Sequence, residues 1–248
     1  MSSSLRAPLA ERVRPRGLQD IVGQDHLLAD DGLVAQALRT GKPPSVILWG
    51  HPGTGKTTIV RVLLAVAREL GQNWRLAAPT GRAAQRLSES CGAEARTIHR
   101  LLGYRPHEGG FTHNAENRLE ADGVIIDEAS MVDLPLMDHL LAALPARCRL
   151  ILVGDADQLP SVGPGQVLRD LIGSGQVAVA SLHQVYRQAS GSGIVRNAHR
   201  VLEGRMPLSS EREEGEGERD FFLLHREEAE SLRQTLIEVV SRRLPALT

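Results

Sequence analysis

Apolar and polar positions alternate along the chain with two periods, and together they predict an α/β fold. Short apolar runs bounded by glycine, proline or acidic residues predict buried strands at residues 45–49, 75–78, 123–126, 149–153 and 177–182. Between them, apolar residues at helical spacing predict helices at residues 56–70, 82–90, 134–144, 166–172 and 194–202. This alternation predicts a parallel sheet with helices on both faces. Such sheets bind ligands at the carboxyl ends of their strands, so we expect the chemistry in the loops that follow these runs.

Less regular segments flank and interrupt this pattern. Residues 1–44 form a polar, helical lead-in, and residues 45–205 carry the α/β pattern itself. Within that domain, residues 103–120 place Gly109-Gly110 between Tyr104 and Phe111, which predicts a small exposed hairpin.

The last part of the chain, residues 206–248, predicts a linker and the truncated start of a second domain. Residues 206–219 are rich in serine, glutamate and glycine, which is typical of a flexible connection. The apolar residues 221–224 and the helical pattern at 227–243 predict the strand and helix of a further βα unit.

Composition narrows the class of protein. The 248 residues are 42% hydrophobic and 24% charged, which is enough apolar material for a buried core. We expect no membrane span, because no apolar run reaches about eighteen residues, and no secretory signal, because the first residues are dotted with arginine. Cys91 and Cys148 stand far apart, which argues against a disulfide framework or a cysteine-ligated zinc site and favours a cytoplasmic location.

Charge is unevenly distributed, although the formal net charge is only −1. Lys42 and Lys56 are the only lysines among the 29 basic residues, so each is a candidate for chemistry that arginine cannot perform. Residues 75–105 are rich in arginine, whereas residues 203–230 are strongly acidic. Nucleic-acid binding would therefore need a local basic patch.

The first chemical motif is a phosphate loop of the pattern G-x-x-x-x-G-K-[ST]. It lies between a predicted strand and a predicted helix, followed by Thr58, and its members are Gly50, His51, Pro52, Gly53, Thr54, Gly55, Lys56 and Thr57. Gly53 and Gly55 let the backbone curl so that its amides and the helix amino end face phosphate oxygens. Lys56 supplies a positive charge to the β- and γ-phosphates, and Thr57 supplies a hydroxyl ligand for Mg²⁺. The alternative is a glycine-rich turn that happens to precede a helix.

The second motif places Asp127 and Glu128 at the end of an apolar strand. A buried strand that ends in two acids needs a cation or a water network to receive the charges. Asp127 fits as a Mg²⁺ partner, directly or through water, and Glu128 fits as the group that activates the attacking water. The alternative is a helix N-cap with an acidic first turn.

The third motif, residues 154–160, follows the next predicted strand. Gln158 in it both donates and accepts hydrogen bonds, so it can respond to the presence or loss of a γ-phosphate. The alternative is a polar turn.

Taken together and in this order, these motifs resemble a known family. The phosphate loop, Ala78–Ala84, Thr97–Leu102, Asp127–Ser130, residues 154–163 and Val185–Gln188 resemble motifs I, Ia, Ib, II, III and IV of superfamily 1 DNA helicases, in the RecD-like group. The resemblance covers about residues 53–240. It implies a RecA-like P-loop ATPase that uses ATP and Mg²⁺ and moves 5′ to 3′ along single-stranded DNA in repair or recombination.

The resemblance also implies roles for individual residues. Lys56, Glu128, Gln158 and Arg187 would form the catalytic set, with Gln158 coupling nucleotide state to DNA and Arg187 reaching the γ-phosphate. Thr80, Gly81, Arg82, Thr97 and His99 would hold DNA phosphates. For Arg82 and Arg86 a solvated helix face is the alternative, and for His99 a hydrogen-bonded core histidine. The hairpin at residues 103–120 would occupy the position of a strand-separating pin.

The first fifty-odd residues resemble a different family. Residues 8–15, 20–28 and 47–50 are similar to the amino-terminal part of replication-associated recombination protein A, an AAA+ ATPase. The two resemblances meet inside the phosphate loop, so the chain has the pattern of a fusion. Motifs V and VI of the helicases find no match, which predicts weak ATPase and weak single-strand binding by a monomer, without processive unwinding. Two alternatives stay open: a ring-forming AAA+ replication-fork factor and an inactive nucleotide-binding fragment.

Overall fold

The chain forms two compact units, Met1–Arg187 and Gln188–Thr248. The computed structural model describes Gly32, Thr40 and residues 43–51, 54–107, 109–182, 193–208 and 221–243. The predicted lead-in at residues 1–44 lies almost entirely outside these ranges. Within them, no helix is long and apolar enough to cross a membrane.

A six-stranded parallel sheet forms the centre of the described part of the first unit, in the order β3-β2-β6-β7-β1-β8. Its strands are β1 (Val46–Gly50), β2 (Trp74–Ala78), β3 (Ala95–Thr97), β6 (Gly123–Ile126), β7 (Arg149–Gly154) and β8 (Val179–Leu182). In the centre of the sheet Ile47 lies opposite both Leu152 and Val179. Because all six strands are parallel, their carboxyl ends meet at one edge of the sheet, where the predicted motifs lie.

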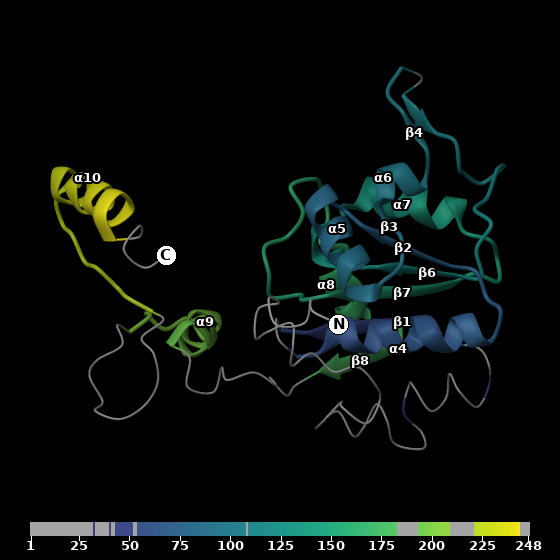
Figure 1. Cartoon of the computed structure of the whole chain (residues 1–248), viewed down its shortest axis with the longest axis horizontal. Coiled ribbons are helices and arrows are strands. Elements are labelled where there is room, and N and C mark those ends of the chain that lie inside the picture. The colour runs from purple at the N-terminus through teal and green to yellow at the C-terminus, as the bar shows by residue number, and fades with distance from the viewer. Residues whose placement is uncertain are drawn as a thin grey trace, which may run out of the picture. The chain divides into compact units, whose positions relative to one another are not determined.

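Helices cover both faces of this sheet (Figure 1). On one face lie α4 (Lys56–Glu69) and α5 (Gly81–Cys91); on the other lie α6 (Ile98–Leu101), α7 (Leu134–Ala143) and α8 (Val167–Ser174). The alternation along β1 shows why: Val46 and Leu48 pack with α4, whereas Ile47 packs with the α7 and α8 side. The predicted fold class is therefore confirmed.

Two small elements complete the described part of the first unit. The predicted hairpin is present as β4 (Tyr104–Arg105) and β5 (Gly110–Phe111), an antiparallel pair that projects beyond the sheet in Figure 1. A single 3₁₀ turn, η2 (Ala129–Met131), follows β6.

The second unit contains α9 (Gly193–Leu202), α10 (Ala229–Glu238) and the π-helical turn η3 (Val239–Arg243). The buried Asn197 of α9 donates from Nδ2 to the Leu208 carbonyl at 2.8 Å and accepts from the Leu208 amide at 2.7 Å. The prediction of a strand at residues 221–224 is wrong, because the structure describes them without regular secondary structure. A strand needs a neighbour to take its backbone hydrogen bonds, and the described residues of this unit form helices instead.

Candidate active site

The phosphate loop connects the carboxyl end of β1 to the amino end of α4. Gly50 ends β1 where a Cβ atom would lie 2.8 Å from the Leu182 carbonyl oxygen of β8, so only glycine fits there. Gly55, at the N-cap of α4, has a left-handed conformation with φ of 90°. The buried Thr54 hydroxyl donates to the His51 carbonyl at 2.8 Å and closes the loop between them. Pro52 and Gly53 lie outside the described residues.

Lys56 points its amine back over this loop. Its Nζ donates to the carbonyl oxygens of Gly50 and, at 3.0 Å, of His51. Burial lowers the pKa of the amine, and the negative charges of three carboxylates oppose that shift. They belong, in order of effect, to Asp155, Asp127 and Glu128. The two acids predicted from the strand end and the lysine predicted from the loop thus interact electrostatically.

Asp127 and Glu128 follow β6 directly. The Asp127 amide still donates to the Ala77 carbonyl of β2 at 2.9 Å, so the first acid stays anchored to the sheet. Its Oδ1 accepts from the Glu128 amide at 3.0 Å. Glu128 has a φ of 53°, and it is the one non-glycine residue in the described ranges with a positive φ. Such strain in an ordinary residue is typical of functional sites, because the surroundings must hold the side chain in place.

The Asp127 environment suits a bound cation. Burial raises the pKa of its carboxyl; the Glu128 amide and Lys56 act in the opposite direction, and the Glu128 charge adds to the increase. A partly buried carboxylate of this kind gains stability from a divalent ion. Thr57 in the first turn of α4 is exposed and supplies a second hard oxygen donor. This donor set fits Mg²⁺.

A link between the phosphate loop and the loop after β7 was missed by the sequence analysis. Asp155, which is 2% exposed, accepts through the same Oδ2 atom from His51 Nδ1 at 3.4 Å and Gln158 Nε2 at 3.4 Å. Asp157 Oδ2 lies 3.9 Å from the other ring nitrogen of His51. His51 and Gln158 were both candidate site residues. Because they lie more than 100 residues apart in the chain, the sequence does not predict that the Asp155 carboxylate joins them.

Ser130 is a second feature that the sequence did not single out. Its hydroxyl is buried and has no hydrogen-bond partner among the described residues. It lines a hollow of 240 Å³ together with Gln158, Pro160 and Arg169. The hollow lies beside the loop that carries Gln158, so a bound group there would contact both motifs.

The candidate DNA contacts Thr80 and Thr97 each cap a helix after neighbouring strands: Thr80 lies two residues beyond the end of β2, and Thr97 is the last residue of β3. Thr80 caps α5, its hydroxyl accepting from the Ala83 amide at 3.2 Å; Thr97 caps α6 and accepts from the Arg100 amide at 3.2 Å. Because Ala78 lies opposite Thr97 in the sheet, both caps are at the same edge. Each hydroxyl accepts in its cap and keeps its own proton for a ligand.

The other candidate DNA contacts are exposed. Gly81 and Arg82 begin α5 on the surface, as the alternative of a solvated helix face also requires. The core-histidine alternative is wrong for His99, which is exposed and packs edge-on against Tyr104 with ring centroids 5.6 Å apart. Phe111 lies 5.8 Å from the same ring. The hairpin and the end of the predicted motif Ib therefore form one aromatic cluster. Arg187 lies outside the described residues.

Comparison with known proteins identifies two relatives that are similar in sequence to this chain. The chain is 46% identical over 162 residues to the ATP-dependent RecD2 DNA helicase of Deinococcus radiodurans, covering 65% of this chain and 22% of that protein. It is 38% identical over 216 residues to the RecBCD enzyme subunit RecD of Mycolicibacterium smegmatis, covering 77% of this chain and 38% of the relative. The chain therefore spans well under half the length of these relatives.

Among solved structures, the crystal structure of Pif1 helicase from Candida albicans has the same fold, with a TM-score of 0.54 at 22% identity. That match covers 70% of this chain and 43% of the other. It supports the RecA-like P-loop fold predicted from the sequence. A sequence model described as AAA domain matches residues 9–218. Because this match extends over most of its length, the chain belongs to the AAA domain family.

Proposed function

We propose that this chain is the motor domain of an ATP-dependent DNA helicase, which couples Mg-ATP hydrolysis to 5′ to 3′ movement along single-stranded DNA. The observation that carries the proposal is a phosphate loop with the Lys56 amine folded over it, at the same carboxyl edge of the sheet as the acids Asp127 and Glu128. The names of the RecD2 and RecD relatives support the coupling to DNA. For the chain itself we propose ATP turnover and binding of single-stranded DNA.

The residues of the loop bind and orient the nucleotide. The amides at the amino end of α4 and the Lys56 amine face the phosphates and neutralise their charge. Thr57 and Asp127 would hold Mg²⁺, which when bound stabilises the charge that develops on the phosphate oxygens. Glu128 orients the attacking water and accepts its proton. By the helicase resemblance, Gln158 would couple the nucleotide state to DNA and Arg187 would reach the γ-phosphate.

The same edge of the sheet supplies a path for DNA. Thr80, Gly81 and Arg82 at the start of α5 offer a hydroxyl, backbone amides and a guanidinium to one stretch of backbone. Thr97 and His99 offer the same kind of contact one strand further along the sheet. The hairpin of β4 and β5, which touches His99 through Tyr104, would then act as the pin that separates strands.

The cellular location and the oligomeric state of the chain are part of the proposal. We place the chain in the cytoplasm, because Cys91 and Cys148 are both free thiols. Burial raises the pKa of each thiol to about 11, which keeps both protonated and unreactive. We expect a monomer; gel filtration with and without ATP tests this, since a ring-forming AAA+ factor would shift to a larger species with nucleotide.

Two variants test the proposed chemistry. Lys56→Ala is expected to abolish binding of a fluorescent ATP analogue. Glu128→Gln is expected to keep binding but lower turnover by roughly 10²- to 10⁴-fold, because it removes the proton acceptor without changing shape. Glu69→Gln, an exposed acid at the end of α4, is the matched control. If Glu128→Gln leaves the measured hydrolysis unchanged while Lys56→Ala abolishes nucleotide binding, the measured hydrolysis does not arise at this site and the chain is only a nucleotide-binding fragment.

A further inference from the structure

A groove with basic side chains lies at the amino ends of the strands, opposite the phosphate loop. A groove of 570 Å³ opens beside the amino end of β2, and four arginines from different segments line it. They are Arg68 of α4, Arg75 of β2, Arg96 of β3 and Arg118 of the loop before β6. Because the phosphate loop follows the carboxyl end of β1, this arginine groove is separate from the nucleotide site.

The arginine groove carries excess positive charge. Its lining holds these four arginines against two acids, Glu94 and Glu120, so two positive charges remain in a chain whose formal net charge is −1. Arg96 Nε lies 2.7 Å from Glu94 Oε1, but both side chains are more than half exposed, so this pair is weak. Among the residues that the structure describes, neither Arg75 nor Arg118 is within ion-pair distance of an acid.

The remaining guanidinium contacts leave donors available. Arg68 donates to the Gly92 carbonyl at 3.5 Å, and Arg118 Nε donates to the Ala115 carbonyl at 3.3 Å. Each guanidinium has five N–H donors, so both can donate several more hydrogen bonds. Guanidinium groups match the oxygens of a phosphate in pairs, which makes a phosphodiester the ligand that this lining suits.

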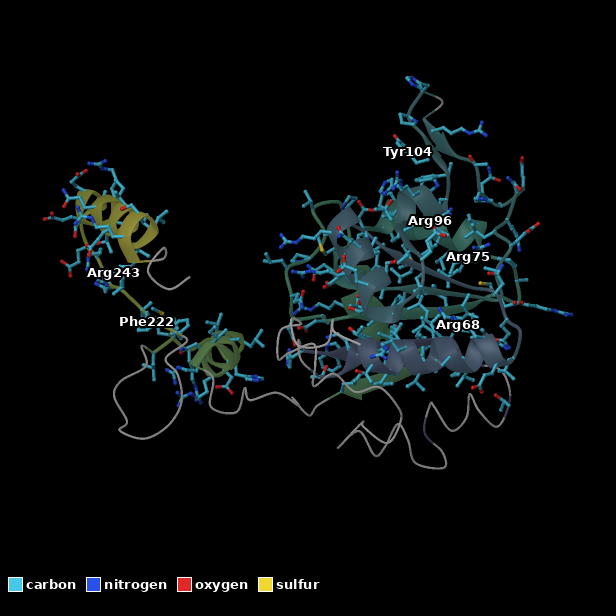
Figure 2. The ribbon with its side chains drawn as sticks, viewed as in Figure 1. Arg68, Arg75, Arg96, Tyr104, Phe222 and Arg243 are labelled. Atoms are coloured by element: carbon cyan, nitrogen blue, oxygen red, sulfur yellow. The ribbon has the colours of Figure 1, made fainter. Side chains whose placement is uncertain are left out.

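A structured loop connects the arginine groove to the hairpin. After β5 the chain returns to β6 through residues that are held in place by side-chain bonds: Asn117 donates to the Thr112 carbonyl at 3.0 Å, and Asn114 Oδ1 accepts from the Asn117 amide at 3.0 Å. His113, Asn117 and Arg118 of this loop line the groove. Figure 2 shows Tyr104 of the hairpin, then Arg96, Arg75 and Arg68, in succession toward α4. The lining of the groove thus includes the chain segment that directly follows the hairpin.

We propose that the arginine groove binds the sugar–phosphate backbone of nucleic acid, outside the path proposed along Thr80 and Thr97. This inference rests on the proposed function. The arginines grip the phosphates of a strand or duplex arm beside the hairpin, without reading its sequence.

The test uses the whole chain and fluorescence anisotropy with two probes, a single-stranded oligonucleotide and the same oligonucleotide carrying a forked duplex arm. Arg75→Gln/Arg96→Gln is expected to bind the fork roughly tenfold more weakly, with a salt slope smaller by about two. Loss on the fork alone assigns the groove to the duplex arm, and equal loss on both probes assigns it to the single strand. The control Arg147→Gln/Arg242→Gln removes two exposed arginines outside the groove and is expected to bind as the unmodified chain does.

A second variant tests the inference in the opposite direction. Glu94→Gln/Glu120→Gln removes both acids of the lining and is expected to bind the same probes several-fold more tightly. The inference is overturned if the arginine variant binds both DNAs like the unmodified chain. If the arginine variant binds DNA as the unmodified chain does and DNA still stimulates ATP turnover, only the proposal for the arginine groove is refuted. A chain that neither binds DNA nor responds to it in turnover refutes the proposed function as well.

Discussion

At the scale of single residues, burial raises the pKa of the Asp127 carboxyl, so its charged form costs the folded chain stability. The folded state holds this proton more tightly than the unfolded chain does. The cost is therefore present above the raised pKa and is relieved as the pH falls through it toward the ordinary value of 3.8.

Asp127→Asn is thus expected to raise the melting temperature by a few degrees at neutral pH while abolishing Mg-dependent ATP turnover. Thermal unfolding of both proteins across a pH series measures the effect. The difference in melting temperature between the two proteins should become smaller as the pH falls below the raised pKa of Asp127. A variant that melts lower than the unmodified chain at neutral pH contradicts this account of the site.

His51 joins the phosphate loop to the loop of Gln158 through Asp155, which predicts a role in coupling. His51→Phe keeps the ring volume but removes both nitrogens. We expect nucleotide binding to remain and the stimulation of ATP turnover by DNA to fall several-fold. A double-mutant cycle with Asp155→Asn checks the link, because the double variant should lose no more than either single one. Additive losses would show that the two residues act independently.

At the scale of elements, the amino ends of α5 and α7 form a matched pair of caps. Thr80 caps α5 at the proposed DNA path, and Asp133 caps α7 by accepting from the Leu136 amide at 2.9 Å. Thr80→Ala and Asp133→Ala should each lower the free energy of unfolding by about 1 kcal/mol. Only Thr80→Ala should also weaken single-strand binding, and Thr80→Ser should restore it. Equal loss of DNA binding in both alanine variants would show that Thr80 acts only as a helix cap.

The elements also show which sequence signals were sufficient. Five strands and their helices were predictable, because each strand contains a short apolar run whose side chains enter the core on both faces of the sheet. The edge strand β3 was not predicted, because three partly exposed residues with an arginine in the middle do not form an apolar run. The apolar residues 221–224 gave the same signal as a strand, but a strand also requires a pairing partner, and that is not encoded in the segment itself.

The features of the candidate site also fall into those that could be predicted from the sequence and those that could not. The phosphate loop and Asp127-Glu128 were predictable because each is a contiguous string with a fixed chemical role. The bond network of Asp155 was not, since it depends on β7 lying beside β1 in the sheet. The arginine groove likewise collects residues from α4, β2, β3 and a loop, and only the fold brings them together.

At the scale of the whole molecule, each described residue of the proposed nucleotide site belongs to the unit Met1–Arg187. A chain shortened after Arg187 is therefore expected to bind a fluorescent ATP analogue with the affinity of the full chain. Titration of both proteins measures this. A loss of more than a few-fold would mean that the unit Gln188–Thr248 contributes to the nucleotide site.

The most direct test of the central claim is steady-state ATP turnover by the unmodified chain, measured with and without single-stranded DNA. The arrangement of Lys56, Asp127, Glu128 and Gln158 predicts slow turnover that depends on Mg²⁺ and increases several-fold when DNA is added. An identical rate with and without DNA, or no turnover at all, would contradict the assignment of this chain as a DNA-coupled motor.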